Sequence, residues 1–342
     1  MSGLTYRDAG VDLEAADESK RRIAELVRST RTAGVLGTEG GFGGLFRLPA
    51  GIHDPVLVSS TDGVGTKLKL AFLTGRHDTV GEDLVNHCVN DILVQGARPL
   101  FFLDYIGAGR VEPAVIEAVV EGVSRGCREN GCALLGGETA EMPDFYAPGE
   151  YDLAGTIVGV AGAERILDGT AIRPGDAVVA LASSGLHTNG YSLARRIVFE
   201  RMGLGVDDPF PGEEASVADV LLRVHRSYFR PIRELLRGGR IRALAHITGG
   251  GLPGNVPRVL PEGVAVRIDR GSWELPNLFR VLQEGGGVTD EEMFRVFNLG
   301  VGMIAIVDPE EADPVRVHLA EAGETAWIAG SVETGDGGLT IA

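Results

Sequence analysis

Apolar residues in the first half of the chain follow helical spacing in some stretches and form short continuous runs in others. Ile23, Leu26 and Val27 recur at helical intervals and predict a first helix over 15–30, after a polar stretch over 1–14 that we expect to be irregular. Further helices are predicted over 79–95 and 113–130, and strands over 56–59, 100–106, 132–135 and 152–160. This alternation of helices and strands favours an α/β or α+β architecture.

The second half repeats the mixed pattern after a turn at 172–176. Strands are predicted over 177–182, 242–247, 263–268 and 301–307, and helices near 191–204, 216–237, 274–284 and 310–322. We therefore expect two mixed α/β domains, with an N-terminal domain over 1–168 and a C-terminal domain over 169–342. A length of 342 residues agrees with two domains that each bury a core.

Charge and composition restrict the classes of partner. The net charge of -16 disfavours a general attraction to nucleic acid or to an anionic membrane, so a phosphate-rich ligand must be met by a local patch. No apolar run approaches the roughly 20 residues that span a bilayer, and the first residues do not resemble a signal peptide. Cys88, Cys127 and Cys132 form no C-x-x-C pair. We expect reduced thiols and a soluble, cytoplasmic protein.

The stretch 61–67, Thr-Asp-Gly-Val-Gly-Thr-Lys, follows a predicted buried strand and combines groups that suit a metal-bound polyphosphate. Asp62 offers oxygen to Mg²⁺, the two glycines let backbone N–H groups approach phosphate, and Lys67 adds a cation. Only three of the 32 basic residues are lysines, so a compact ammonium at position 67 is notable. The alternative is a tight glycine turn beside an ordinary surface lysine.

Two further carboxylates stand at similar places. Asp91 lies between Val89 and Ile92 in an apolar predicted helix, and Glu138 follows an apolar run that ends in two glycines. Together with Asp62 they would suit a hard cation such as Mg²⁺. The alternatives are a salt bridge or a surface position for Asp91, and a solvated acid in a glycine turn for Glu138.

The glycine-rich stretch 37–44 is too loose for a regular element and has apolar flanks. We expect a mobile loop that closes over a ligand.

Polar loops follow two strands of the second half. The stretch 183–192 offers hydroxyls, the imidazole of His187 and an amide before a helix, and 246–251 repeats the strand-to-glycine form. A phosphate site, or His187 as a proton carrier, fits this pattern, and a hydrogen-bonded structural histidine is the alternative. The sequence has no evident Ser–His–Asp or Cys–His set, which disfavours covalent acyl chemistry.

Two familiar nucleotide motifs do not fit. None of the lysines follows a glycine, which excludes a Walker A P-loop. The string 249–254 matches G-x-G-x-x-G, with Asp269 at a plausible distance, but Pro253 and Pro257 would break the helix that a Rossmann fold requires.

Taken together, the motifs resemble those of the phosphoribosylformylglycinamidine cyclo-ligase (aminoimidazole ribonucleotide synthetase) family. They occur in order over nearly the whole chain, and a small departure is Leu186, where a proline is common. The matching stretches are YRDAGVD (6–12), GGFGG (40–44), STDGVGTK (60–67), CVND (88–91), QGA (95–97), FFLDY (101–105), GGETAEMP (136–143), SSGLHTNGYS (183–192), HITGGG (246–251) and FNLGVGM (297–303).

The resemblance implies a two-domain fold without a P-loop, shared with thiamine-monophosphate kinase, selenophosphate synthetase and a hydrogenase-maturation protein. It implies a homodimer whose first domains pair their sheets into a barrel-like core. ATP would lie in a cleft lined by the glycine-rich loop, the Asp62 turn, the Asp91 helix and the Glu138 loop.

The resemblance also implies roles for individual residues. The metal ligands would be Asp62, Asp91 and Glu138, and the catalytic residues Lys67 and His187. The ATP contacts would be Gly41, Gly43, Gly44, Thr61, Gly63, Gly65, Thr66 and Asn90, and the substrate contacts Ser184, Asn189, Thr248, Gly249 and Gly250.

The implied reaction is the ATP-dependent closure of an imidazole ring on formylglycinamidine ribonucleotide, in purine biosynthesis, with release of ADP and phosphate. It would proceed by phosphorylation of the formyl oxygen, with Mg²⁺ as cofactor. Two alternatives are a small-molecule kinase of the same fold and a non-catalytic nucleotide sensor.

Overall fold

The computed structural model describes residues 4–37 and 41–342 and divides into two units. Unit 1 comprises Met1–Ile92 and Pro99–Val160, and unit 2 comprises Leu93–Arg98 and Ala161–Ala342. The domain boundary predicted at residue 168 stays a prediction. The two units divide after Val160, and unit 2 also includes the short 93–98 segment. In the described part of the chain, no helix is long and apolar enough to cross a membrane.

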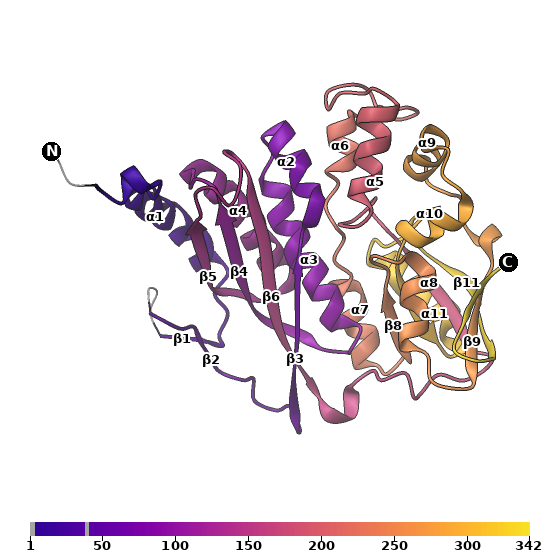
Figure 1. Ribbon diagram of the computed structural model, residues 1–342. Helices are drawn as coiled ribbons and strands as arrows, with labels where there is room; N and C mark the ends of the chain where they lie inside the picture. Colours follow the sequence, from indigo (N-terminus) through magenta and orange to yellow (C-terminus); the bar gives the residue numbers. More distant parts are fainter. Residues whose placement is uncertain (1–3, 38–40) are drawn as a thin grey trace. The chain divides into compact units, whose positions relative to one another are not determined.

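Unit 1 is built on a four-stranded sheet in the order β3-β6-β4-β5. The strands are β3 (Pro55–Gly63), β4 (Arg98–Ala108), β5 (Ala133–Glu141) and β6 (Tyr151–Gly162), and the helices are α1 (Leu13–Ser29), α2 (Leu68–Thr74), α3 (Asp78–Leu93) and α4 (Pro113–Asn130). Strands β3 and β5 form opposite edges of the sheet, as Figure 1 shows. A short hairpin of β1 (Val35–Leu36) and β2 (Leu45–Phe46) completes the strands described in this unit.

Glycines let α3 and α4 pack closely. A Cβ at Gly81 would meet the Val119 carbonyl oxygen at 2.1 Å, and one at Gly122 would meet the Asp78 carbonyl oxygen at 1.8 Å. Larger residues cannot be accommodated where two backbones approach this closely. Helix α3, which carries several charged side chains of the candidate site, therefore packs directly against the backbone of α4.

Unit 2 is built on a six-stranded sheet in the order β12-β9-β11-β7-β10-β8. Its strands are β7 (Ala177–Ala182), β8 (Ala243–His246), β9 (Val264–Ile268), β10 (Val301–Val307), β11 (Ala326–Thr334) and β12 (Leu339–Ile341). Its helices include α5 (Tyr191–Arg195), α6 (Val217–Leu221), α7 (Phe229–Arg237), α8 (Gly251–Asn255), α9 (Asn277–Gly286), α10 (Asp290–Val296) and α11 (Ala312–Glu321).

Strands β7 and β8 flank β10, and both are antiparallel to it. They therefore run in the same direction, and their last residues reach the same edge of the sheet. Ala182 pairs with Val301, and His246 pairs with Met303. The polar loops that follow β7 and β8 consequently start side by side.

The sequence predicted most of these elements but one prediction was wrong. The expected continuous helix over 216–237 is two helices, α6 and α7, separated by an irregular segment over 222–228. His225 and Tyr228 in this segment are fully buried. Buried polar groups need hydrogen-bond partners. In the irregular segment, His225 contacts His246 and Tyr228 donates to the Ala182 carbonyl oxygen.

Candidate functional site

The end of β3 and the turn after it are joined to α3 by charged side chains in unit 1. Asp83, His87 and Asp91 are spaced four residues apart and so lie along one face of α3. His87 Nε2 lies 2.9 Å from Asp62 Oδ2 and 3.9 Å from Asp91 Oδ2. The structure thus brings together Asp62 and Asp91, two of the three carboxylates predicted as metal ligands.

His87 lies between the two carboxylates and is almost fully buried. Burial opposes the charged imidazolium, but the hydrogen bond to Asp62 and the charges of Asp91, Asp62 and Asp83 outweigh it, so the pKa of His87 is raised. His87 was not among the predicted site residues. Its place four residues before Asp91 in a predicted helix was the signal that could have identified it.

Both carboxylates also accept hydrogen bonds that fix their orientation. Asp62 Oδ1 accepts from its neighbour Gly63 N at 2.7 Å, and Asp91 Oδ2 accepts from Ser60 Oγ at 3.1 Å. The side chains of Asp62 and Asp91 remain 41% and 25% exposed, so oxygen lone pairs stay accessible to a ligand.

Lys67, which the sequence predicted to contact a phosphate, forms a buried ion pair, and its phosphate contact stays a prediction. Its side chain is fully buried, and Nζ lies 2.8 Å from Asp83 Oδ1 and 2.7 Å from Asp83 Oδ2. Burial lowers the pKa of Lys67, although the Asp83 charge partly opposes this shift. The ammonium therefore serves a buried ion pair that ties the turn to α3, rather than extending from the surface.

Other predicted nucleotide contacts lie around the same turn. Gly65 has a φ of 64°, which an L side chain would adopt only with strain. Thr66 is exposed, and Thr61 Oγ1 lies 2.7 Å from Thr156 Oγ1 on β6. Asn90 is fully buried on α3.

Glu138 and Gly44 do not join this group within one chain. Glu138 lies on β5, opposite Tyr105 of β4, and two strands separate it from β3. Three inter-strand spacings amount to roughly 14 Å, too far for Glu138 and Asp62 to share one ion. A Cβ at Gly44 would meet Leu135 of β5 at 2.4 Å, so this part of the stretch also lies at the β5 edge.

The expected closing motion of the glycine-rich stretch stays a prediction. Residues 38–40 lie outside the described residues. Gly41 and Gly43 are exposed and lie in the segment that connects β1 to β2.

Two polar loops of unit 2 meet at the ends of β7 and β8. We call them the 183–190 loop and the 246–250 loop. A Cβ at Gly249 would lie 3.2 Å from Asn189 Oδ1, so the loops are in contact. Asn189 Nδ2 is buried and has no hydrogen-bond partner among the described residues. This amide can donate to a ligand held between the loops.

Two asparagine side chains donate hydrogen bonds to the backbone of these loops. Asn255 Nδ2 donates to the carbonyl oxygens of Thr248, Gly249 and Gly251 at 3.3, 3.2 and 2.8 Å. Asn298 Nδ2 donates to the Gly185 carbonyl oxygen at 2.8 Å, and Ser183 Oγ donates to Asn298 Oδ1 at 3.0 Å. The structure therefore brings together the predicted substrate contacts Ser184, Asn189, Thr248, Gly249 and Gly250 on two supported loops.

His187 lies in the first of these loops but is fully buried, with a φ of 62°. Its Nε2 accepts a hydrogen bond from Ser184 N at 3.2 Å. This assigns the proton of the neutral ring to Nδ1. The predicted role of His187 as a proton carrier stays a prediction.

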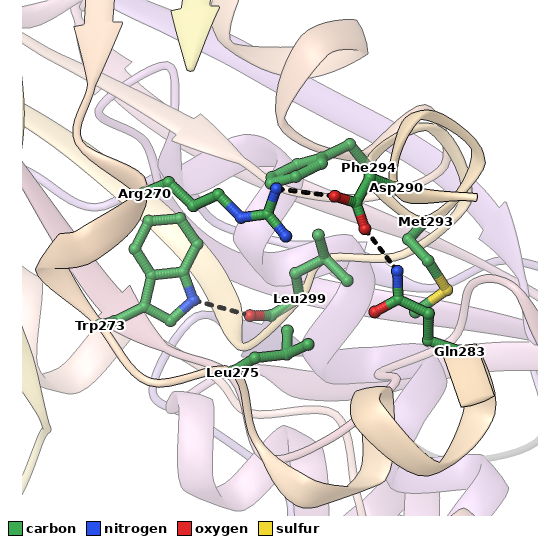
Figure 2. Close-up of a pocket in the computed structure, with 8 residues that line it drawn as sticks. All are labelled: Arg270, Trp273, Leu275, Gln283, Asp290, Met293, Phe294 and Leu299. Atoms are coloured by element: carbon green, nitrogen blue, oxygen red, sulfur yellow. Dashed lines mark hydrogen bonds and ion pairs between the residues drawn. The ribbon is translucent and has the colours of Figure 1, made fainter. Parts of the chain in front are cut away.

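A separate cavity of about 120 Å³ lies in unit 2 (Figure 2). In the wall of this cavity, Arg270 Nη1 donates to Asp290 Oδ2 at 2.9 Å and Gln283 Nε2 donates to Asp290 Oδ1 at 2.5 Å. Trp273 Nε1 donates to the Leu299 carbonyl oxygen at 3.0 Å. Its lining residues are Arg270, Trp273, Leu275, Gln283, Asp290, Met293, Phe294 and Leu299. None of them is a predicted site residue, and their polar groups bind one another.

Comparison with known proteins identifies relatives over nearly the full length. Family models described as the N-terminal and C-terminal domains of AIR synthase related protein match residues 46–161 and 173–341. A protein of Citrifermentans bemidjiense named phosphoribosylformylglycinamidine cyclo-ligase is 52% identical over 98% of this chain and 97% of its own. One of the same name from Sorangium cellulosum is 56% identical over 96% of this chain and 95% of its own.

Solved structures share the fold at lower identity. A hydrogenase maturation protein HypE in complex with ATP matches with a TM-score of 0.68 and 22% identity, over 94% of this chain and 90% of that chain. Thiamine-monophosphate kinase from Stenotrophomonas maltophilia matches with a TM-score of 0.67 and 16% identity, over 94% and 95%. These two likenesses concern the fold alone.

Proposed function

The chain belongs to the phosphoribosylformylglycinamidine cyclo-ligase family, and from this premise we propose how its residues carry out the family's reaction. The protein is an ATP-dependent carbon–nitrogen ligase that converts formylglycinamidine ribonucleotide to 5-aminoimidazole ribonucleotide in purine biosynthesis. The observation that carries this function is the identity of 52% and 56% to two cyclo-ligases over nearly their entire length.

Asp62 and Asp91 would hold a magnesium ion beside the phosphates of ATP. Both offer partly exposed carboxylate oxygens, which are the ligands that Mg²⁺ prefers. Their hydrogen bonds to Gly63 N and Ser60 Oγ keep the oxygens oriented. When bound, the ion would neutralise charge on the phosphates during phosphoryl transfer.

The chemistry requires a leaving group that a formamide lacks. The γ-phosphoryl group of ATP passes to the formyl oxygen, which breaks the β–γ phosphate bond and releases ADP. The ribosyl-bearing nitrogen then attacks the formyl carbon and loses its proton, and the carbon–oxygen bond breaks as phosphate leaves. Such a reaction depends mostly on positioning, which the β3 turn and α3 supply through the Asp62–His87 and Lys67–Asp83 contacts.

The ribonucleotide would lie against the two loops of unit 2. The buried, unpartnered Nδ2 of Asn189 supports this proposal, since a ligand oxygen would satisfy it. Ser184, Thr248 and the backbone at Gly249 and Gly250 offer further polar groups for its phosphate and hydroxyls.

We propose a homodimer in which unit 1 completes its site across the subunit interface. The predicted nucleotide residues fall at both edges of one sheet, with Asp62 on β3, Glu138 on β5 and Gly44 against β5. Leu57, Leu103 and Tyr105 are exposed on the sheet at 57%, 36% and 39%. Pairing of two such sheets would bury these apolar side chains and bring opposite edges of two chains together.

Mixed dimers test this arrangement. Asp62→Asn and Glu138→Gln should each be nearly inactive alone. Refolded together they should recover about a quarter of wild-type activity, because half of randomly paired dimers are mixed and each mixed dimer has one intact site. Mixing Asp62→Asn with Asp91→Asn is the matched control and should recover no activity. The same subunit contributes both residues to a given site, so every site in a mixed dimer lacks one of them. Equal recovery in both mixtures would contradict a shared site.

A product assay tests the reaction itself. With formylglycinamidine ribonucleotide and ATP, we expect ADP, free phosphate and aminoimidazole ribonucleotide in equal amounts. A kinase of the same fold would instead leave the γ-phosphate of ATP attached to its substrate. A nucleotide sensor would release no phosphate from ATP. Phosphate that stays bound to an organic product would therefore exclude the cyclo-ligase activity.

A further inference from the structure

The irregular 222–228 segment of unit 2 is attached to the 183–190 loop by side chains rather than by a backbone ladder. Ser184 Oγ donates to the Val224 carbonyl oxygen at 2.5 Å, and Tyr228 Oη donates to the Ala182 carbonyl oxygen at 2.8 Å. The second bond is made at the last residue of β7, and the first is made two residues after it. The segment is thus in direct contact with the start of the 183–190 loop.

His225 of this segment contacts both loops. Its Nδ1 lies 3.3 Å from Thr188 Oγ1 of the 183–190 loop, and its Nε2 lies 3.0 Å from Nε2 of His246, where the 246–250 loop begins. Its ring stacks on that of His187, with centroids 4.0 Å apart and planes 19° from parallel. The side chain is fully buried, so these contacts exclude water.

The hydrogen bonds form a linked chain from Thr188 through His225 to His246. A bond between two imidazole nitrogens places one proton between them, so one ring donates and the other accepts. If His225 donates from Nε2, its Nδ1 accepts from the Thr188 hydroxyl, and if His225 accepts at Nε2, its Nδ1 donates to that hydroxyl. In either case one imidazole contacts both loops, through Nδ1 at Thr188 and through Nε2 at His246. A shorter side chain could not reach both residues.

The stacking excludes a metal chelate as the role of this histidine cluster. An imidazole binds a metal ion in the plane of its ring, at a distance of about 2.0–2.1 Å for zinc. The nearly parallel rings of His187 and His225 cannot both direct a lone pair at one ion. The geometry instead favours a packed, hydrogen-bonded junction.

We propose that His225 is a positioning residue that fixes the two substrate loops relative to each other and thereby sets the affinity for the ribonucleotide. This inference rests on the proposed function of those loops. His225 itself would not contact the substrate, since Thr188, His187 and His246 surround it. Its loss would let Asn189 and Gly249, which meet between the loops, move apart.

The test compares three variants of the full-length enzyme. His225→Ala removes both bonds, His225→Asn retains a polar group near Thr188, and His225→Gln retains one that reaches toward His246. For His225→Ala we expect a rise of about tenfold or more in the KM for the ribonucleotide, from two lost bonds, with the KM for ATP nearly unchanged. Asn and Gln should each restore part of the affinity.

His318→Gln is the matched control. His318 also lies in unit 2, where its Nε2 is 3.2 Å from the Pro231 carbonyl oxygen, outside both loops. Its variant should keep both KM values. Long-range ¹⁵N spectra of the wild-type protein should in addition show His187 protonated at Nδ1 and one proton shared by His225 and His246.

The outcomes separate the inference from the proposed function. A wild-type protein that forms no aminoimidazole ribonucleotide would refute the function. An active wild type with an unchanged ribonucleotide KM in folded His225→Ala, or in both His225→Asn and His225→Gln if the alanine variant does not fold, would refute the positioning role alone. Equal rises in the KM for ATP and for the ribonucleotide would also refute it.

Discussion

Asp62→Asn and Asp91→Asn are each expected to lower kcat by orders of magnitude while the protein stays folded. Each change removes a negative charge from a partly exposed oxygen donor set, where a cation and ATP phosphates would bind. The amide that replaces the carboxylate keeps nearly the same shape and can still accept the hydrogen bond from Gly63 N or Ser60 Oγ. The loss should therefore appear in turnover rather than in folding.

The measurement is steady-state phosphate release over a range of Mg²⁺ concentrations, together with thermal unfolding. Asp168→Asn is a suitable control, because Asp168 also accepts a backbone hydrogen bond, from Thr170 N at 3.0 Å, but is an exposed residue of unit 2. Its variant should keep full activity. Near-normal rates of either Asp62→Asn or Asp91→Asn at saturating Mg²⁺ would remove that residue from the metal site.

The periodicity of the sequence was sufficient for most of unit 1. The predicted helix over 113–130 coincides with α4, and the predicted strand over 100–106 lies within β4. Each of these elements buries one regular apolar face, so the spacing of apolar residues along the chain is sufficient to predict it. The hairpin of β1 and β2, with two residues in each strand, has too short a pattern to be predicted in this way.

The candidate site was only partly predictable because strand order is not local information. Asp62 and Asp91 meet because α3 packs beside the end of β3. Glu138 ends a similar apolar run in the sequence, yet β5 is at the opposite edge of the sheet. No spacing along the chain reveals that two strands separate them.

His225 illustrates a different limit of sequence analysis. The apolar residues over 216–237 are compatible with one helix, so the irregular segment that carries His225 was not expected. Its function depends on Thr188 and His246, which are far away in the sequence. Only the fold brings the three side chains together.

Lys67→Met is expected to lower the free energy of unfolding by about 3–5 kcal/mol, because it leaves the Asp83 carboxylate buried without its ammonium partner. Both side chains of the pair are fully buried, with Nζ 2.7 Å from Asp83 Oδ2. The double variant Lys67→Met/Asp83→Leu should recover much of this stability, since it removes both buried charges. Urea unfolding of the three variants, including Asp83→Leu alone, measures the coupling between the two residues.

Lys69→Met provides a matched control two residues away. Lys69 also forms an ion pair, with Nζ 2.6 Å from Glu150 Oε1, but its side chain is 41% exposed. An exposed pair contributes only about 0–1 kcal/mol. If Lys67→Met and Lys69→Met lose similar stability, Lys67 does not act as a buried clamp.

Lys67→Arg distinguishes a clamp from a direct phosphate contact. The guanidinium keeps the charge but is wider and planar, so it should not fit the fully buried space beside Asp83 without displacing the turn that follows Asp62. A displacement of about 1 Å at a reacting group can cost on the order of a hundredfold in rate. We therefore expect kcat and the unfolding midpoint to fall together, with a modest change in the KM for ATP. A fall in kcat with unaltered stability would instead indicate that Lys67 contacts the phosphate directly, and an unchanged kcat would remove it from the site altogether.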